Sequence, residues 1–320
     1  ALAQFPVEKT LKFFQELGIF TTDRSGWIYP RSNQAQSVVD VLVMKARSLK
    51  VKLKTNQTVT GVSFADGQWK IHTDGWTYSG DAVILANGSR ASSVAGSCES
   101  GYEIAKSLGH HLIEPLPALT ALKCKGNSFS GWSGVRTEGT ITLYIDGTPT
   151  VSQQGELQLT DYGVSGIPVF QISRYAIRAV HENKNVELSI NFFPELNRKE
   201  LEEYLEHRKA ACPYKTEKEL LIGLFPEKLI RVLCAQKDLI RGVTDFRLPV
   251  KNGLSFEQAQ VCSGGVDTSE VHSKTMESRL HKGLYFAGEL LDIDGTCGGY
   301  NLQWAWSSGA TAGIWAAKEE

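Results

Sequence analysis

The sequence has no apolar run that approaches the roughly 18 residues needed to span a membrane, so we expect no membrane partner. It has no excess of either charge, and the formal net charge of -1 predicts no nucleic-acid partner. Its six cysteines include no CxxC pair, which favours neither a zinc site nor a disulfide framework. With reduced thiols as the default and no charged-then-apolar leader, we expect a cytoplasmic protein without a bound metal.

The remaining composition is that of an ordinary globular protein, and 320 residues are enough for two or three structural units. Apolar residues recur at helical spacing in 7–17, before Gly18, and again after Asn33, where Leu49 is expected to face inward with Val38, Val41 and Leu42. Short strands are expected at 51–54, 58–64, 68–73 and 76–79. The stretch "DAVILANGS", residues 81–89, predicts a parallel strand that is buried on both faces.

The middle of the chain has a different character. "ALTALKC", "GTITLYIDG" and "GELQLTD" alternate like antiparallel strands and are separated by glycine-rich turns. One helix interrupts them, with Ser165 expected as its cap and Pro168 in its first turn. Further on, Asn197 with Glu200, and likewise the pair at 216 and 219, resemble capping boxes. The order predicts an α/β domain that is interrupted by a β-barrel-like and helical insertion.

The C-terminal stretch "ELLDIDGTCGGYNLQWAWSSG" follows an apolar strand that ends in Gly288 and Glu289. A carboxylate at the carboxyl end of a parallel strand is well placed to accept hydrogen bonds from ligand hydroxyls. Gly298-Gly299 would let backbone approach a ligand, and the helix from Tyr300 would direct its N–H groups toward it. A plain glycine turn followed by a core helix with buried Trp304 and Trp306 is the alternative interpretation.

Two further stretches can each be interpreted either as ligand contacts or as ordinary structural positions. Asn87-Gly88, at the end of the predicted buried strand, would let the chain pass beneath a dinucleotide, but a strand-to-loop turn has the same pattern. Val59 would offer its backbone to an adenine edge, although a strand valine is the simpler interpretation.

Long segments of the chain resemble one protein family. "TMESRLHKGLYFAGELLDIDGTCGGYNLQWAWSSGATAG" is similar to the C-terminal signature of the BaiN/YhiN-like NAD(P)/FAD-dependent oxidoreductases, some of which are aminoacetone oxidase-like flavoproteins. "SFEQAQVCSGGV", "GELQLTDYGVSGIPVFQISR", "GWIYPRSNQAQSVVDVL" and "AVILANGS" resemble other parts of the same family. The resemblance therefore covers nearly the whole chain.

The resemblance implies a fold and a site. The fold would be a glutathione-reductase-type FAD-binding domain, in two parts at 1–116 and 264–320. A β-rich insert would cover 117–194 and 245–263, and a helical insert 195–244. Glu289 and Gly288 would face the ribityl and pyrophosphate part of FAD. The other implied contacts are Val59, Asn87 and Gly88 on the adenine side, Gly264 and Gly265 near the ring, and Gly298, Gly299, Tyr300, Asn301 and Leu302 at the isoalloxazine.

The chain also departs from the family pattern. It contains no GxGxxG, and the family's "SGGGRCN" loop is not found, so we expect the FAD domain to be incomplete through a truncated N-terminus. The segment 87–101 differs from a family pattern richer in Thr and Gly. The GxGxxG turn brings N–H groups to the FAD pyrophosphate. We therefore expect weak or absent FAD binding by this chain as it stands.

Three other features are assigned structural roles. His110-His111 follow the predicted helix stop Gly109 and are expected in a solvated loop. Cys297, beside the expected flavin, is interpreted as a space-filling residue and not a redox thiol. Asp292 and Asp294 alone do not make a metal site.

The resemblance implies a flavin-dependent oxidoreductase that transfers hydride between NAD(P)H, as a transient reductant, and a small organic substrate or oxygen. The sequence identifies no catalytic acid or base. Two alternatives stay open: a truncated flavoprotein fragment without FAD or catalysis, and a flavin-dependent enzyme that modifies nucleic acid. The sequence leaves the oligomeric state unknown.

Overall fold

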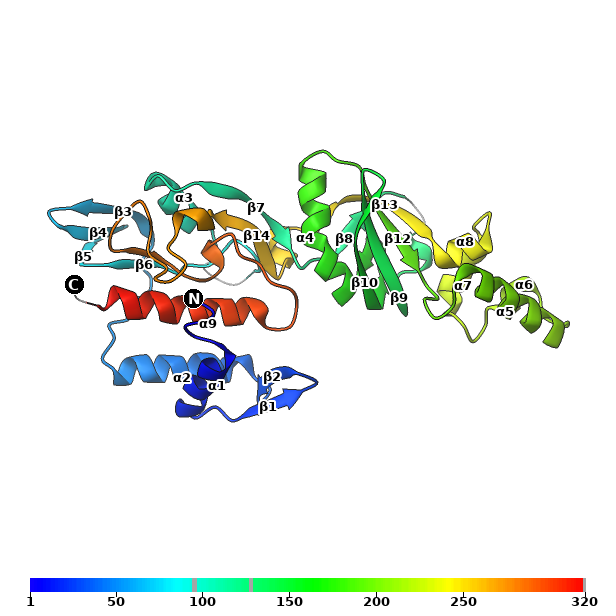
Figure 1. Cartoon of the computed structure of the whole chain (residues 1–320), viewed down its shortest axis with the longest axis horizontal. Helices are drawn as coiled ribbons and strands as arrows, with labels where there is room; N and C mark the ends of the chain where they lie inside the picture. The colour runs from blue at the N-terminus through cyan, green and yellow to red at the C-terminus, as the bar shows by residue number, and fades with distance from the viewer. Residues whose placement is uncertain (94–96, 127–128, 319–320) are drawn as a thin grey trace. The chain divides into compact units, whose positions relative to one another are not determined.

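A computed structural model describes residues 1–93, 97–126 and 129–318 (Figure 1). It divides into two compact units, the first made of Ala1–Arg90, Val94–Pro115 and Ser263–Glu320, and the second of Ala91–Ser93 and Leu116–Cys262. The chain passes from the first unit to the second along β7 (Leu112–Ala118) and returns along β14 (Val261–Val266). The divergent segment 87–101 includes residues 94–96, which lie outside the described residues.

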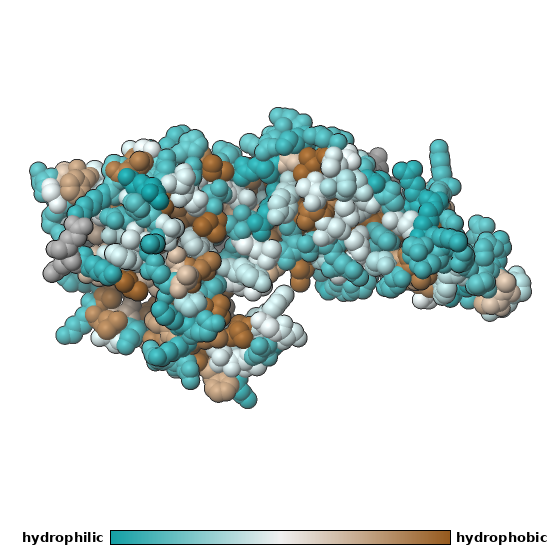
Figure 2. Space-filling view, in the orientation of Figure 1, coloured by the Kyte–Doolittle hydropathy of each residue, from teal (hydrophilic) through white to brown (hydrophobic). Residues whose placement is uncertain are grey.

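The first unit begins with α1 (Val7–Glu16), the hairpin β1 (Thr21–Arg24) and β2 (Trp27–Pro30), and α2 (Ala35–Ser48). Both helices were expected from their apolar spacing. The expectation that α2 buries one side was wrong in part. Leu49 is 63% exposed, and every residue of α2 is at least partly exposed. Figure 2 accordingly shows hydrophobic side chains on the surface over these elements. The strand expected at 51–54 is an exposed irregular segment.

Among the described residues, the first unit also contains two further sheets and two further helices, besides its parts of β7 and β14, which pair with each other. β3 (Val59–Ala65), β4 (Gln68–Thr73) and β5 (Thr77–Gly80) form an antiparallel sheet, and β6 (Val83–Leu85) pairs in parallel with β15 (Leu284–Phe286). α3 (Ser100–Ser107) and α9 (Tyr300–Ala316) pack with them. β15 is buried, but Ile84 of β6 is 37% exposed. The expectation that residues 81–89 are covered on both faces is wrong, because Ile84 is exposed on one face of β6 while Leu85 is buried on the other.

The second unit is built on a closed six-stranded barrel in the order β10-β11-β8-β13-β12-β9. The strands are β8 (Leu122–Cys124), β9 (Val135–Ile145), β10 (Thr148–Leu159), β11 (Gly163–Ser165), β12 (Val186–Asn191) and β13 (Phe246–Gly253). Alternate residues along them, such as Ile141, Leu143 and Leu157, are fully buried. This alternation is what the sequence predicted for an antiparallel, one-sided sheet.

α4 (Ile167–His181) packs its buried stripe, which includes Val169 and Ile172, against the barrel. The expected cap at Ser165 is wrong. Ser165 ends β11, and Gly166, at φ +106°, is the residue before the helix. A Cβ on Gly166 would lie 2.6 Å from the carbonyl oxygen of Glu156, so the close approach of two backbones requires glycine there.

The helical part of this unit contains α5 (Arg198–Ala211), α6 (Glu217–Leu220), α7 (Glu227–Cys234) and α8 (Leu239–Thr244). Both expected capping boxes are confirmed, at Asn197 with Glu200 and at Thr216 with Glu219. Short 3₁₀ turns occur at Phe129–Gly131 (η1), Phe256–Gln258 (η2), Thr268–Glu270 (η3) and Gly288–Leu290 (η4). Among the helices of the described residues, none has the length and apolar character to cross a membrane.

Candidate functional site

The candidate site lies where β6 and β15 end. These strands run in parallel with Val83 opposite Leu284 and Leu85 opposite Phe286, and the N–H of Ala287 donates to the carbonyl of Leu85 at 3.0 Å. Residues 87–88 follow one strand, and residues 288–289 follow the other. The structure therefore places two of the sequence-predicted pairs together at the carboxyl edge of one sheet, where α/β proteins bind ligands.

The turn at Gly288 is fastened to α9. Gly288 has φ +70°, its N–H donates to Ser308 Oγ at 2.9 Å, and its carbonyl accepts from Trp304 Nε1 at 2.9 Å. Ser308 Oγ in turn donates to the carbonyl of Trp304 at 2.6 Å. Trp304 is half-buried, so it anchors the helix through its indole N–H as well as through packing.

The start of α9 is open. Gly298 and Gly299 have φ +113° and +90°, and Gly299 immediately precedes the helix without a side-chain cap. A Cβ on Gly299 would have no described heavy atom within 4 Å. The first N–H groups of any helix lack intrahelical partners and carry partial positive charge. This end of α9 therefore combines free space with a preference for negative charge.

The next three residues have different environments. Tyr300 and Leu302 are 63% and 61% exposed. The Asn301 side chain is bonded to Gly295: its Oδ1 accepts from the Gly295 N–H at 2.7 Å, and its Nδ2 donates to the Gly295 carbonyl at 3.1 Å. The amide of Asn301 thus shapes the loop before the helix.

At Gly264 and Gly265, on β14, close approach of neighbouring backbone leaves no room for a side chain. Their φ values are +107° and +144°, and a Cβ would lie 2.4 Å from the Glu114 carbonyl oxygen at the first and 2.6 Å from the Leu290 carbonyl oxygen at the second. The Asp292 N–H also donates to the Val266 carbonyl at 3.0 Å. Gly264 therefore lets β14 pack directly on the β7 backbone, and Gly265 lets it pack on the backbone that follows Glu289.

The adenine-side residues are more dispersed. Gly88 has φ +71° and open space beside it among the described residues. Asn87 packs against α3, because a Cβ at Gly101 would coincide with its amide. Val59 is half-buried at the start of β3, opposite Thr73, in a different sheet of the same unit. Val59 packs against the hydrophobic cluster that includes Leu85 of β6, three residues before Gly88.

The expectation of a solvated loop at His110-His111 is wrong for His110. Its side chain is fully buried, with Nδ1 2.9 Å from Glu270 Oε2 and Nε2 2.9 Å from Ser278 Oγ. The neighbouring His111 is exposed. Sequence inspection had no signal for this, since the partners of His110 are 160 and 168 residues away.

The hydrogen bonds around Ser278 determine which His110 nitrogen carries the proton. Ser278 Oγ accepts from the N–H groups of Leu280 and His281 at 3.0 Å, which uses both lone pairs of the hydroxyl oxygen. Its own hydrogen must therefore be donated to His110 Nε2, and His110 Nδ1–H donates to Glu270. Burial lowers the pKa of His110, while the hydrogen bond to Glu270 and its charge act in the opposite direction.

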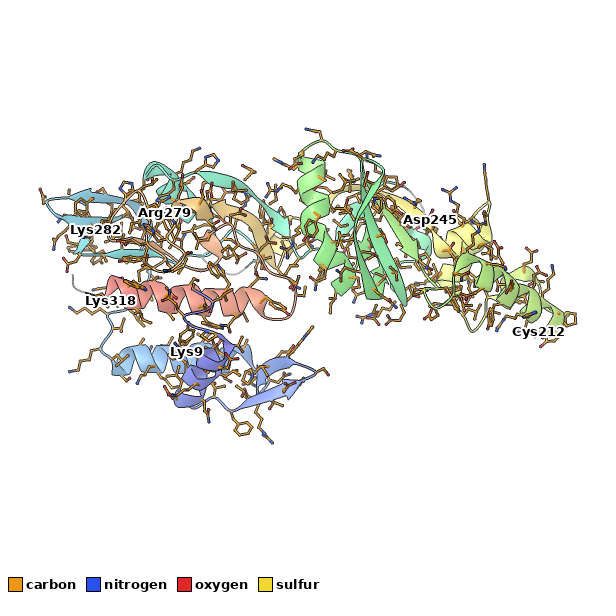
Figure 3. All side chains as sticks on the ribbon, in the orientation of Figure 1. Lys9, Cys212, Asp245, Arg279, Lys282 and Lys318 are labelled. Carbon is orange, nitrogen blue, oxygen red and sulfur yellow. The ribbon has the colours of Figure 1, made fainter. Side chains whose placement is uncertain are left out.

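This hydrogen-bond network lies against β15, although His110 is far from that strand in the sequence. The His110 ring lies edge-on against Phe286 of β15 at 4.8 Å, and His281 Nε2 is 2.6 Å from the Leu108 carbonyl oxygen. Figure 3 labels Arg279 and Lys282, the charged residues of the turn that leads from Ser278 to β15. We interpret His110 as a residue that positions β15.

α9 is also tied to α1. Gln303 Nε2 donates to the Phe5 carbonyl at 3.2 Å and to Thr10 Oγ1 at 3.0 Å, and the Phe14 and Trp306 rings meet edge-to-face at 5.0 Å. Trp306, expected to be buried, is half-buried. Gln303 and Trp306, three positions apart on α9, therefore both face α1 and the segment before it.

An apolar cavity lies beside Trp304. Its volume is about 330 Å³. It is lined by Leu2, Val271, Met276, Leu291 and Trp304, among others. Trp304 therefore lines this cavity and is also hydrogen-bonded to the Gly288 turn.

Comparison with known proteins identifies the family. Residues 1–315 match the HI0933-like protein Rossmann domain. The 3-dehydro-bile acid delta(4,6)-reductase of Clostridium scindens is 42% identical over 334 residues, which cover 99% of this chain and 82% of that protein. Ribosomal RNA dihydrouridine synthase is 30% identical in Escherichia coli (90% of this chain, 72% of that protein) and 33% identical in Haemophilus influenzae (71% and 58%). The chain therefore belongs to the HI0933-like Rossmann-domain family of flavoprotein oxidoreductases, and it is an oxidoreductase enzyme.

Proposed function

We propose that the first unit binds FAD with the isoalloxazine at the start of α9, and that the enzyme transfers hydride from NAD(P)H to a small organic molecule. The observation that carries this proposal is the open, side-chain-free start of α9 at Gly299, next to the paired ends of β6 and β15. A flat ring with electron-rich carbonyls needs both properties, free space and N–H donors. The residues therefore fit the ring end of a flavin.

Each residue of the site has a role in this proposal. FAD supplies the hydride chemistry when it is bound. The first N–H groups of α9 favour negative charge on the ring, and Gly288 leaves room beside the sheet edge. Glu289 accepts hydrogen bonds from ribityl or ribose hydroxyls. Asn87 and Gly88 line the same edge on the β6 side.

A competition experiment tests the position of the ring. Binding of FAD to the 320-residue chain is followed by quenching of flavin fluorescence, up to high micromolar FAD because we expect weak affinity. Lumiflavin, which contains the ring alone, should displace FAD, whereas ADP should not. Displacement by ADP without displacement by lumiflavin would assign these residues to the adenine end instead.

We predict that Glu289→Ala weakens FAD binding by about tenfold to a hundredfold, because a charge-assisted hydrogen bond contributes roughly 1.5–3 kcal/mol. Glu289 is half-buried at a strand end, so folding should be little affected. The matched control is Glu206→Ala, an exposed carboxylate of α5 in the second unit. An FAD affinity equal to that of the unsubstituted chain would remove Glu289 from the site.

The nicotinamide is proposed to meet the flavin transiently. Residues 118–263 contain no GxGxxG, and in their described part they form an antiparallel barrel with helices. NADPH should therefore protect amides from hydrogen exchange in the first unit, near residues 288–302. Protection confined to residues 118–263 would contradict this arrangement.

Two relatives are named for dihydrouridine formation in ribosomal RNA, so RNA is the second candidate substrate. The reductase relative, which is named for a bile acid, has the higher identity, and the net charge of -1 gives no general attraction to phosphates. We therefore favour a small-molecule substrate. Tight, salt-sensitive binding of ribosomal RNA fragments would reverse this preference.

A further inference from the structure

The hairpin of β1 and β2 holds Trp27 in a defined place. Ser25 and Gly26 have φ +56° and +87°, which are the left-handed values of a two-residue hairpin turn. The Gly26 N–H donates to Asp23 Oδ1 at 2.7 Å, and Arg24 pairs with Trp27 across the hairpin. Trp27 is therefore presented by a rigid turn in the first unit.

Trp27 meets the start of α9. A Cβ placed on Gly298 would lie 3.6 Å from Trp27 Cε2 and Nε1, and also 3.6 Å from Tyr300 Cε2. The indole edge and the phenol ring thus flank one position that has no side chain. Both rings remain largely open, since Trp27 is 43% and Tyr300 is 63% exposed.

Trp27 and Tyr300 are the aromatic residues of this part of the site, and they can both stack on a ligand and donate a hydrogen bond to it. Each has an apolar face that can stack on a flat molecule and one polar group, an indole N–H or a phenol O–H, that can orient it. Ile28 follows Trp27 in a strand and Leu302 lies two positions after Tyr300 in a helix, so these side chains face other directions and the two rings supply the apolar surface by themselves. Both rings lie at Gly298, one residue before the open helix start at Gly299, and therefore beside the proposed flavin ring.

Resting on the proposed function, we infer that Trp27 and Tyr300 form the substrate wall of the site and select a flat, fused-ring apolar molecule with a hydrogen-bonding carbonyl. The carbonyl would accept from the indole N–H or the phenol O–H. A free nucleobase, which is smaller and more polar, would gain less from the two ring faces.

The test uses progesterone, a fused-ring ketone, and uridine as the polar planar probe, each titrated calorimetrically into the chain with FAD present. The chain should bind progesterone, and Trp27→Ala and Tyr300→Ala should each weaken this binding by about tenfold or more. Trp27→Phe should retain most of it. The matched control is Trp76→Ala, which removes another tryptophan of the same unit that is 70% exposed and should have no effect.

The outcomes separate the inference from the proposed function. Lumiflavin that still displaces FAD, combined with no progesterone binding or with equal binding by both alanine variants, would overturn the inference alone. Preferential binding of uridine would also overturn it. If Trp27→Ala loses lumiflavin together with progesterone, Trp27 belongs to the flavin contacts and the inference fails. Failure of lumiflavin to displace FAD from the unsubstituted chain would overturn the proposed function itself.

Discussion

Gly265→Ala should lower the free energy of unfolding by roughly 3 kcal/mol or more. Two costs add. A non-glycine residue with left-handed φ costs roughly 1–2 kcal/mol, and forcing a methyl group into packed backbone costs about 1–3 kcal/mol. At Gly265 the added Cβ would lie 2.6 Å from the Leu290 carbonyl oxygen, and φ is +144°. Urea denaturation followed by tryptophan fluorescence measures the loss.

Gly299→Ala is the matched control for this prediction. Gly299 also has left-handed φ, but its Cβ would meet no described atom within 4 Å, so only the conformational cost of roughly 1–2 kcal/mol should remain. The same methyl group would occupy the proposed ring position, so FAD affinity should fall although the fold persists. Equal losses of stability in the two variants would show that the β14 contact is not tight.

His110→Phe should have the second large effect, a loss of about 2–4 kcal/mol in the free energy of unfolding. The substitution leaves the buried Ser278 hydroxyl without its acceptor, which costs about 1–3 kcal/mol, and it also removes one of the donors to the partly exposed Glu270. His110→Gln should be milder, because its carboxamide can accept from Ser278 and donate to Glu270. Equal losses for Phe and Gln would indicate that ring packing on Phe286, and not the hydrogen bonds, makes His110 important.

The same histidine should make stability depend on pH. Burial lowers the pKa of folded His110 below its unfolded value of about 6.5. The unfolded state therefore binds more protons in the window between the two pKa values, and stability rises with pH there. The contribution is fully present above about pH 6.5 and is lost as pH falls toward the folded pKa. The titratable groups that act on the pKa of His110 are Glu270, which raises it, and His281, which lowers it.

The pH effect is measured as the difference in unfolding free energy between pH 7.5 and pH 5.5. His110→Gln should lose less stability on acidification than the unsubstituted chain. His111→Gln, which changes the exposed neighbour, should behave like the unsubstituted chain. An unchanged loss in His110→Gln would mean that other groups account for the acid sensitivity.

Several parts of the candidate site follow from local sequence. Gly288-Glu289 and Asn87-Gly88 end apolar strands, and a strand end next to a glycine is visible in the sequence because strand period and turn chemistry are local properties. The same holds for the open helix start at Gly299. Capping boxes at Asn197 and Thr216 were readable for the same reason, since the two bonded residues are three positions apart.

Other features depended on contacts between distant segments. The resemblance implied Gly264 and Gly265 as residues near the flavin ring, and only the structure shows that backbone from residues 114 and 290 occupies their Cβ positions. His110 looked solvent-exposed, yet its partners are 160 and 168 residues away. The identity of a glycine or a histidine does not predict which distant residue it contacts, because many different contacts favour the same residue type.

The sequence by itself determined the alternation of helices and strands, the antiparallel character of the insert and the family resemblance, all of which rest on local spacing and on long matching segments. Only the tertiary structure decided the strand order of the barrel, the burial of His110, and the meeting of Trp27 with Gly298 at the start of α9. Packing between segments hundreds of residues apart selects one among many pairings that local propensity allows equally. For that reason the ends of β6 and β15 were predictable to within a few residues, whereas the neighbours that surround them were not.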